Sequence, residues 1–107
     1  MIDAGFSGFP HKIFNPNRLS ILITLKIKEE EKKEAIRFHN LKHSLKLTDG
    51  NLASHLRTLE QEGYISISSR IDGKRQKTFI SITPKGLEVL EMFSYMMENI
   101  LKVLAKE

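Results

Sequence analysis

The 107-residue sequence contains no cysteine, which excludes disulfide bonds and thiolate metal sites. A secreted scaffold held together by disulfides is therefore excluded as well. The first residues lack the basic segment and the apolar run of a signal peptide, and no stretch approaches the roughly 18 apolar residues that a membrane span requires. We expect a cytoplasmic protein with no membrane segment.

The common motifs of catalysis are also missing. The sequence has no Gly-rich phosphate loop, no G-x-S-x-G elbow and no cysteine nucleophile, so we expect neither an enzyme nor a cofactor. His39 and His43 have the i, i+4 spacing that can hold zinc, but no cysteine or nearby carboxylate pair completes a site. We interpret them as a chance helical pair and predict no metal site.

Positive charge is concentrated in one part of the chain. The 17 Lys and Arg residues against 13 Asp and Glu give a net charge of +4, which by itself favours an anionic partner only weakly. The location of the charge is more informative than its sum. Residues 63–86 contain one acid, Asp72, and the basic residues Arg70, Lys74, Arg75, Lys77 and Lys85.

A chain of this length fits one domain, and its helices have clear start signals. Asn15-Pro16 and Thr83-Pro84 each place a side-chain N-cap before a proline at the first helical position, and Thr48 offers a further N-cap. Gly63 supplies a C-terminal stop. The sequence predicts helices over 16–28, 49–62 and 84–106, a short helix from Asn40, and a turn or brief strand over 35–38.

A β-hairpin is expected directly after the helix over 49–62. Residues 65–70 alternate with period two, and residues 79–82 supply the apolar side chains of a second strand. Asp72-Gly73 is a hairpin-turn signal, because both central residues of such a turn need a positive φ. The order of helix, short helix, tight turn, helix, hairpin and long helix indicates an α+β, mainly helical fold of the winged helix-turn-helix type.

Two segments carry a family resemblance. The run LTDGNLASHLRTLEQEGYI, residues 47–65, resembles the recognition helix and first wing strand of the MarR superfamily, especially its small archaeal-type regulators with a winged helix DNA-binding domain. The run ITPKG, residues 82–86, is similar to the L-T-P-x-G entry into the C-terminal helix of that family. The resemblance covers about residues 18–93 and implies a homodimeric transcriptional regulator.

The helix over 49–62 has a polar face opposite the apolar stripe of Leu52, Leu56 and Leu59. Such a helix fits the major groove, where Asn and Gln pair with adenine, Arg with guanine and Ser with several bases. His55 lies at the flank, where it could contact DNA or stand at the edge of the core. An ordinary solvated helix face is the alternative. The expected DNA contacts here are Gly50, Asn51, Ser54, His55, Arg57, Thr58 and Gln61.

The hairpin gathers basic residues around its predicted turn. As a wing, it would meet an adjacent minor groove or its phosphates, because arginine favours narrow minor grooves and lysine contacts phosphate. A charged edge that discourages aggregation is the alternative. The expected DNA contacts of the wing are Arg70, Lys74, Arg75 and Lys77.

The last predicted helix has an apolar stripe with 3,4 spacing that is too wide for one small domain to cover. We therefore expect a homodimer, and the family resemblance implies that the helix over 16–28 contributes to it. Folding of the last helix back on its own domain is the alternative. The expected interface residues are Leu19, Leu22, Ile23, Leu90, Phe93, Met97, Ile100, Leu101 and Leu104.

Three units follow from these patterns: an N-terminal arm over 1–14, a DNA-binding domain over 15–86 and a dimerisation helix over 87–107. The aromatic residues of the arm could pack on a partner subunit, or the arm could be frayed.

We interpret the protein as a sequence-specific binder of double-stranded DNA that controls transcription, most simply by repression. A protein-interaction module is one alternative, but the polar face of the helix over 49–62 is less apolar than a protein-binding surface should be. A regulator that responds to a small apolar effector is another, and no residue marks its pocket.

Overall fold

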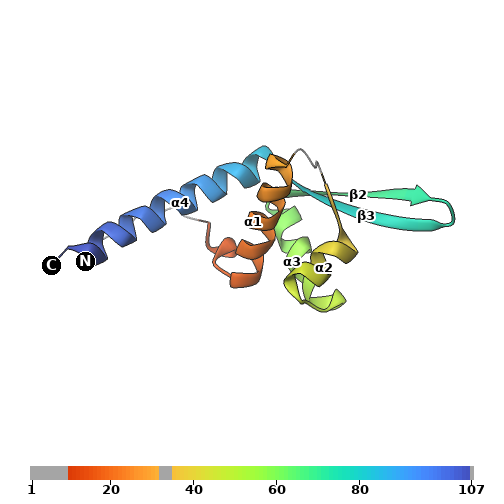
Figure 1. The fold of residues 1–107 in the computed structure, drawn as a ribbon, viewed down its shortest axis with the longest axis horizontal. Helices are drawn as coiled ribbons and strands as arrows, with labels where there is room; N and C mark the ends of the chain where they lie inside the picture. The colour runs from red at the N-terminus through yellow and green to blue at the C-terminus, as the bar shows by residue number, and fades with distance from the viewer. Residues whose placement is uncertain (1–9, 32–34, 107) are drawn as a thin grey trace.

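The computed structural model describes residues 10–31 and 35–106 (Figure 1). It confirms the predicted α+β winged helix-turn-helix architecture. Residues 1–9 of the predicted arm and residues 32–34 lie outside the described residues. The elements in chain order are η1 (His11–Ile13), α1 (Pro16–Glu30), β1 (Ile36–Arg37), α2 (Phe38–Leu45), α3 (Asp49–Gln61), β2 (Ile65–Asp72), β3 (Arg75–Ile82) and α4 (Pro84–Ala105).

Side-chain caps fix three of the four α-helix starts. Asn15 Oδ1 accepts the backbone N–H of Asn17 at 2.9 Å at the start of α1. Thr48 and Thr83 cap α3 and α4 in the same way, each accepting a backbone N–H at 3.1 Å, so all three predicted N-caps are confirmed. The short helix α2 begins at Phe38 rather than at Asn40, and its start carries no side-chain cap that the sequence could have signalled.

Two left-handed residues end the helices of the helix-turn-helix. Gly63, with φ of +81°, follows α3 as predicted. After α2 the left-handed position is taken by Lys46, with φ of +55°, and the N–H of Leu47 donates to the carbonyl of Lys42 at 3.1 Å. A lysine in this conformation costs about 1–2 kcal/mol relative to a glycine. The tight turn between α2 and α3 therefore stores strain that a glycine would relieve.

The sheet has three antiparallel strands in the order β1-β3-β2. The segment predicted as a turn or brief strand supplies β1, whose Ile36 lies opposite Ile80. The hairpin of β2 and β3 is the predicted wing. It projects from one end of the molecule, while α4 projects from the other, and the molecule measures 61 × 28 × 23 Å (Figure 1).

The turn at the tip of the hairpin differs from the prediction. Asp72 pairs with Arg75, so the central residues of the turn are Gly73 and Lys74, one position later than expected. Of these two, Gly73 alone has a positive φ, at +66°, which places glycine where a type II′ turn requires it. The expectation that both central residues have positive φ is therefore wrong, because the strand pairing continues through Asp72.

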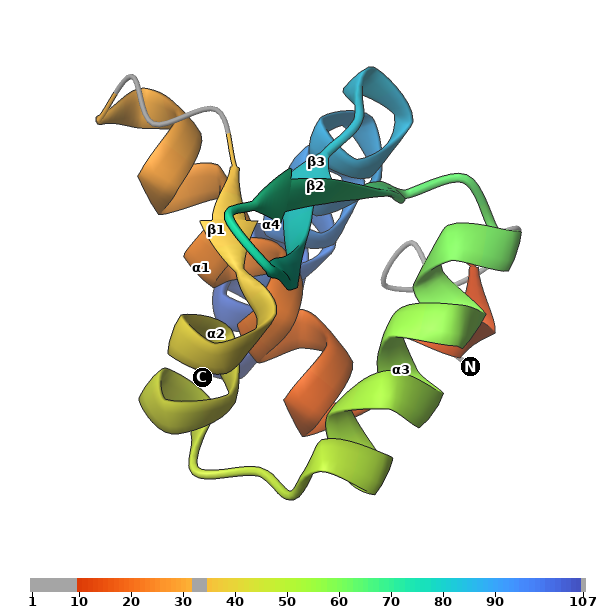
Figure 2. The ribbon, with the colours of Figure 1, turned by 90° about the vertical axis from the view of Figure 1, so that its right-hand side faces the viewer.

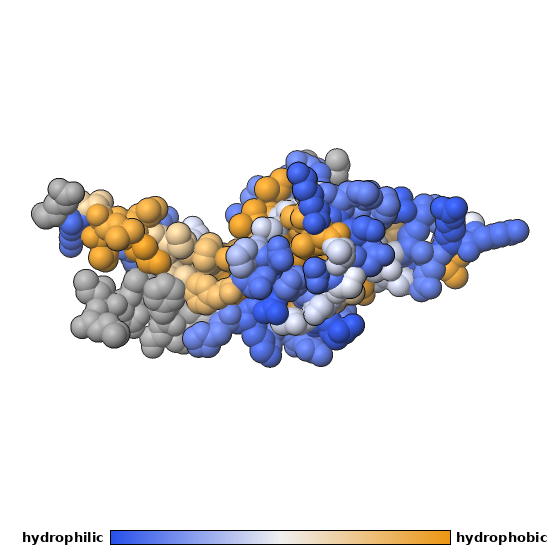
Figure 3. Space-filling view, turned by 90° about the horizontal axis from the view of Figure 1, so that it is seen from below, coloured by the Kyte–Doolittle hydropathy of each residue, from blue (hydrophilic) through white to orange (hydrophobic). Residues whose placement is uncertain are grey.

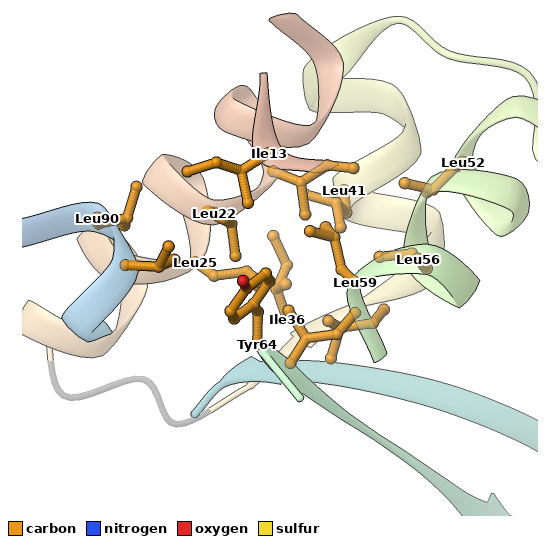
Figure 4. Packing of buried hydrophobic residues seen from close by; sticks show 14 of the residues in the cluster. Ile13, Leu22, Leu25, Ile36, Leu41, Leu52, Leu56, Leu59, Tyr64 and Leu90 are labelled. Carbon is orange, nitrogen blue, oxygen red and sulfur yellow. The ribbon is translucent and has the colours of Figure 1, made fainter. Parts of the chain in front are cut away.

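The core lies between α1, α2, α3 and the base of the sheet (Figure 4). The predicted stripe of Leu52, Leu56 and Leu59 is buried in it, and so is Ile13 from the segment that the sequence assigns to the arm. α2 and α3 lie on the same side of the hairpin in both ribbon views (Figure 2). No helix within the described ranges is both long and apolar enough to cross a membrane.

Candidate nucleic-acid interface

The outer face of α3 is open to solvent. Thr58 is half-buried, and its hydroxyl donates to the backbone carbonyl of Ser54 at 3.4 Å. A Cβ built on Gly50 would meet no atom within 4 Å, so folding of the chain does not require glycine there. The predicted contact residues of α3 that are exposed are Gly50, Asn51, Ser54, Arg57 and Gln61.

His55 lies at the core edge rather than on this outer face. It is half-buried, and its Nδ1 accepts a hydrogen bond from Nε of Arg18 at 3.2 Å. Burial and then the positive charge of Arg18 lower the pKa of His55 from the ordinary value of 6.5. Because Nδ1 accepts, the neutral ring carries its proton on Nε2. Arg18 also donates to the carbonyl of Lys12 at 2.8 Å, so one guanidinium connects α1, α3 and the N-terminal segment.

The acid at the start of α3 is neutralised within the chain. Asp49 stands in the first turn, where a carboxylate interacts favourably with the helix dipole. Its carboxylate lies 2.9 Å from Nζ of Lys42 on α2. This ion pair reduces the repulsion that Asp49 would exert on an approaching polyanion.

Two of the four basic side chains of the wing have partners within the hairpin. Nζ of Lys77 lies 2.6 Å from the carboxylate of Asp72, and this hydrogen bond and charge lower the pKa of Asp72. The guanidinium of Arg70 stands 4.5 Å from the centroid of the Phe79 ring. Lys74 and Arg75 are exposed, and neither makes an ion pair within the described ranges. The tip of the wing therefore offers two unpaired cations.

The strand register divides the wing into two faces. Ile67 and Thr78 line a cavity of about 270 Å³ together with Arg57 and other residues of α3, so their face of the hairpin is turned toward α3. Arg70 and Lys77 are paired across the strands on the opposite face. The register therefore places Arg70, Arg75 and Lys77 on the face turned away from α3, and Lys74 lies in the turn.

A second hollow, of about 200 Å³, lies between the start of α2 and the wing. Arg37 and His39 line it from the side of α2, and Gln76 and Lys77 from the side of β3. Arg37 was not among the predicted contact residues, because its segment was predicted only as a turn or brief strand. Arg37 can contact a phosphate at this position, whereas Lys77 is already paired with the carboxylate of Asp72.

The two histidines of α2 contact one another edge to face. The rings of His39 and His43 are 4.4 Å apart between centroids, at an interplanar angle of 71°. Within the described part of the chain, no group of three or more metal-binding side chains is gathered.

Some apolar side chains of α4 are buried in the core of the single chain, and others are exposed to solvent. Val89, Leu90 and Met96 are buried in the single chain, while Leu101 and Leu104 are 61% and 73% exposed. Hydrophobic residues gather along this helix in the space-filling view (Figure 3). The folding back that the sequence left open as an alternative thus applies to the side of α4 that carries Val89, Leu90 and Met96, and the last turns of α4 extend beyond the domain (Figure 1).

The residues predicted for the dimer interface fall into three groups, which are buried, half-buried and exposed. Leu22 and Leu90 are 0% and 8% exposed, and they belong to the core of the single chain. Leu19, Phe93 and Ile100 are half-buried, and several exposed neighbours were not among the predicted interface residues. The exposed large hydrophobic side chains of α1 and α4 are Ile23, Ile27, Met92, Tyr95, Met97, Leu101, Val103 and Leu104.

The comparisons with known proteins agree with this geometry. Residues 18–101 match the family model described as a winged helix DNA-binding domain. The uncharacterized protein MJ0432 of Methanocaldococcus jannaschii is 40% identical over 62 residues, which cover 58% of this chain and 67% of that protein.

Solved structures show the same fold. The transcriptional regulator homologue from Pyrococcus horikoshii OT3 superposes with a TM-score of 0.78 at 28% identity, over 97% of this chain and 100% of that one. MarR superposes with a TM-score of 0.71 at 18% identity, over 94% of this chain and 69% of its own. A MepR mutant from a multidrug resistant clinical isolate of Staphylococcus aureus gives 0.70, also at 18% identity, over 94% and 67%. This chain therefore belongs to the winged helix DNA-binding domain family and has the fold of the MarR-type transcriptional regulators.

Proposed function

We propose that this protein binds double-stranded DNA sequence-specifically as a homodimer and represses transcription by occupying promoter DNA. The proposal rests on two solvent-exposed surfaces that lie on the same part of the molecule. One is the outer face of α3, with Asn51, Arg57 and Gln61, and the other is the wing tip, with Lys74 and Arg75. Both lie on the part of the molecule away from the second half of α4 (Figure 1).

The face of α3 has the chemistry of base readout. In the major groove Arg57 can donate two hydrogen bonds to a guanine, and Asn51 or Gln61 can pair with an adenine. Gly50 lets the start of α3 approach a phosphate closely, where the helix dipole favours negative charge. Because His55 is held by Arg18, its role is to fix the rotation of α3 about its axis rather than to read a base.

The wing supplies affinity rather than base recognition. Lys74 and Arg75 have no ion pair to give up, so they can contact phosphates or enter a narrow minor groove. Lys77 is already neutralised by Asp72 and contributes less unless that pair opens. Arg70 is oriented by the Phe79 ring and can approach the backbone without a large loss of side-chain entropy.

The exposed apolar half of α4 is the surface that joins two subunits. A row of leucines and methionines of this length is unfavourable in water, and burial against a second copy removes it. The proposed interface excludes Leu22 and Leu90, because the single chain already buries them. A two-fold dimer would present its α3 helices about 34–36 Å apart and recognise a pseudo-palindrome.

Selection of bound fragments from a pool of genomic or random DNA tests this function. The expected result is enrichment of one inverted repeat with half-sites about one helical turn apart. Loss of that enrichment with the Arg57→Ala variant would tie the motif to α3. A pool that stays random with the parent protein would contradict sequence-specific binding.

A further inference from the structure

Ile71, near the tip of the wing, is 81% exposed, more than any other large hydrophobic side chain in the described ranges. It pairs with Gln76 across the hairpin, one step before the pair of Asp72 and Arg75 that closes the turn. Exposed apolar side chains are avoided on hairpin edges because they promote association of strands. An isoleucine at this position is therefore expected to be covered by another molecule.

The register places Ile71 on the face of the wing that is turned toward α3. Side chains alternate along a strand, so Ile71 shares its face with Ile67, which lines the cavity shared with Arg57 of α3. The neighbours of Ile71 on this face carry no charge. They are Ser69, Gln76 and Thr78.

The basic residues of the hairpin lie behind this uncharged patch and in the turn beside it. Arg70 and Arg75 stand on the opposite face, and Lys74 lies in the turn. An apolar partner protein would have to desolvate these charges, whereas a polyanion would be attracted by them. A minor groove has the matching arrangement, since phosphates form its rims and sugars and base edges form its walls and floor.

We propose that Ile71 is a specificity-determining residue that packs on the floor of the minor groove beside the α3 half-site and excludes guanine there. This inference rests on the proposed function. A·T pairs present only acceptors at the floor of the minor groove, but a G·C pair adds the protruding N2 amino group of guanine. Methyl groups pressed onto that amino group would leave its donor buried without a partner. An A·T pair has no such donor, so the same methyl groups can pack on the floor of the minor groove there.

A base analogue separates this contact from other sources of A·T preference. Inosine opposite cytosine keeps the major-groove pattern of guanine but lacks the N2 amino group. The full chain would be titrated with three duplexes that share the selected half-sites and differ only at the wing-contacted flank, which carries A·T, G·C or I·C pairs. The expected order is equal binding of A·T and I·C, each on the order of tenfold tighter than G·C.

Two variants complete the experiment. Ile71→Ser should abolish the difference between the G·C and I·C duplexes, and Ile71→Val should keep most of it. Gln76→Ala, on the same face and opposite Ile71, is the matched control and should keep the parent order. Because Ile71 is exposed, the melting temperature of Ile71→Ser should equal that of the parent chain.

Three other results would contradict either the inference or the proposed function. If Ile71→Ser still prefers A·T and I·C over G·C, the preference comes from the arginines of the wing and the inference is overturned. If Ile71→Ser instead changes the association of the free protein in sedimentation, Ile71 packs against a second copy of the chain. That result would also overturn the inference. If the parent chain shows no preferred duplex in the selection, the proposed function itself has failed.

Discussion

The hydroxyl of Thr83 donates to the backbone carbonyl of Gly63 at 2.6 Å, which fastens the start of α4 to the end of α3. The same hydroxyl caps α4, and the N–H of Thr83 donates to the carbonyl of Tyr64 at 3.0 Å. Nζ of Lys85 adds a hydrogen bond to the carbonyl of Glu62 at 2.8 Å. These bonds make one rigid joint between the helix proposed to read DNA and the helix proposed to dimerise.

The closest packing in this joint is at Gly86, and its substitution by alanine should destabilise the fold. A Cβ there would lie 2.2 Å from the carbonyl oxygen of Tyr64, which is backbone and cannot give way easily. We expect Gly86→Ala to lower the free energy of unfolding by about 1–3 kcal/mol or more in urea titration. Gly50→Ala is the control, since no atom lies within 4 Å of its Cβ, and it should stabilise α3 by up to about 1 kcal/mol. Equal stability of Gly86→Ala and the parent would refute the close contact.

Stability should fall on mild acidification because of His55. Burial and the charge of Arg18 lower the pKa of His55, so the unfolded chain binds this proton more readily than the folded one. The contribution of neutral His55 to the free energy of unfolding is complete above pH 6.5, the ordinary pKa that the unfolded chain has. It is lost as the pH falls from there through the lower pKa of the folded chain. We expect the urea midpoint to decrease between about pH 7 and pH 5, and His55→Gln to weaken that dependence.

A His55→Gln profile that coincides with the parent profile would show that protonation of His55 does not contribute to the pH dependence of stability.

Salt dependence tests the unpaired cations of the wing tip. Replacing both Lys74 and Arg75 by alanine should weaken binding on every duplex and reduce the log–log salt slope by about 1 for each phosphate that a subunit no longer neutralises. Lys102→Ala with Lys106→Ala removes the same charge at the far end of α4 and should leave the slope unchanged. An unchanged slope in the wing variant would mean that the hairpin does not contact DNA. A protein-interaction surface would then be the better explanation of the basic hairpin.

The proposed interface on α4 can be tested without disturbing the core. Leu101 is 61% exposed in the single chain, so Leu101→Asp should leave the chain folded while placing a charge in the seam between subunits. Sedimentation should show a dimer for the parent and for Leu101→Met, and a monomer for Leu101→Asp. A parent chain that sediments as a monomer at tens of micromolar, on the order of where an ordinary interface holds, would rule out this dimer.

Local signals predicted most of the fold. The capping side chains Asn15, Thr48 and Thr83 stand next to the helices they start, so the element order could be predicted. The start of α2 at Phe38 has no capping side chain and was missed. The turn at Gly73 was displaced by one residue because strand pairing, a longer-range property, extends through Asp72.

The candidate site was harder to predict where it depends on tertiary packing. Helical spacing identified an apolar stripe on α4 but could not show that Leu90 is covered by its own chain while Leu104 is not. Composition identified the cations of the wing, and alternation along the strand separates Arg70 from Ile71, but only the folded structure showed which face is turned toward α3. The hydrogen bond between Arg18 and His55, 37 residues apart, has no local signature at all.

The most direct test of base readout is the affinity of the parent and of Arg57→Ala for the selected DNA site and for a scrambled duplex of the same length. The parent should bind its site at least about a thousandfold more tightly than the scrambled duplex at physiological salt. Arg57→Ala should lose about 1–3 kcal/mol of binding free energy on the site and almost none on the scrambled DNA. Equal losses on the two duplexes, or equal binding of both by the parent, would contradict base readout by α3.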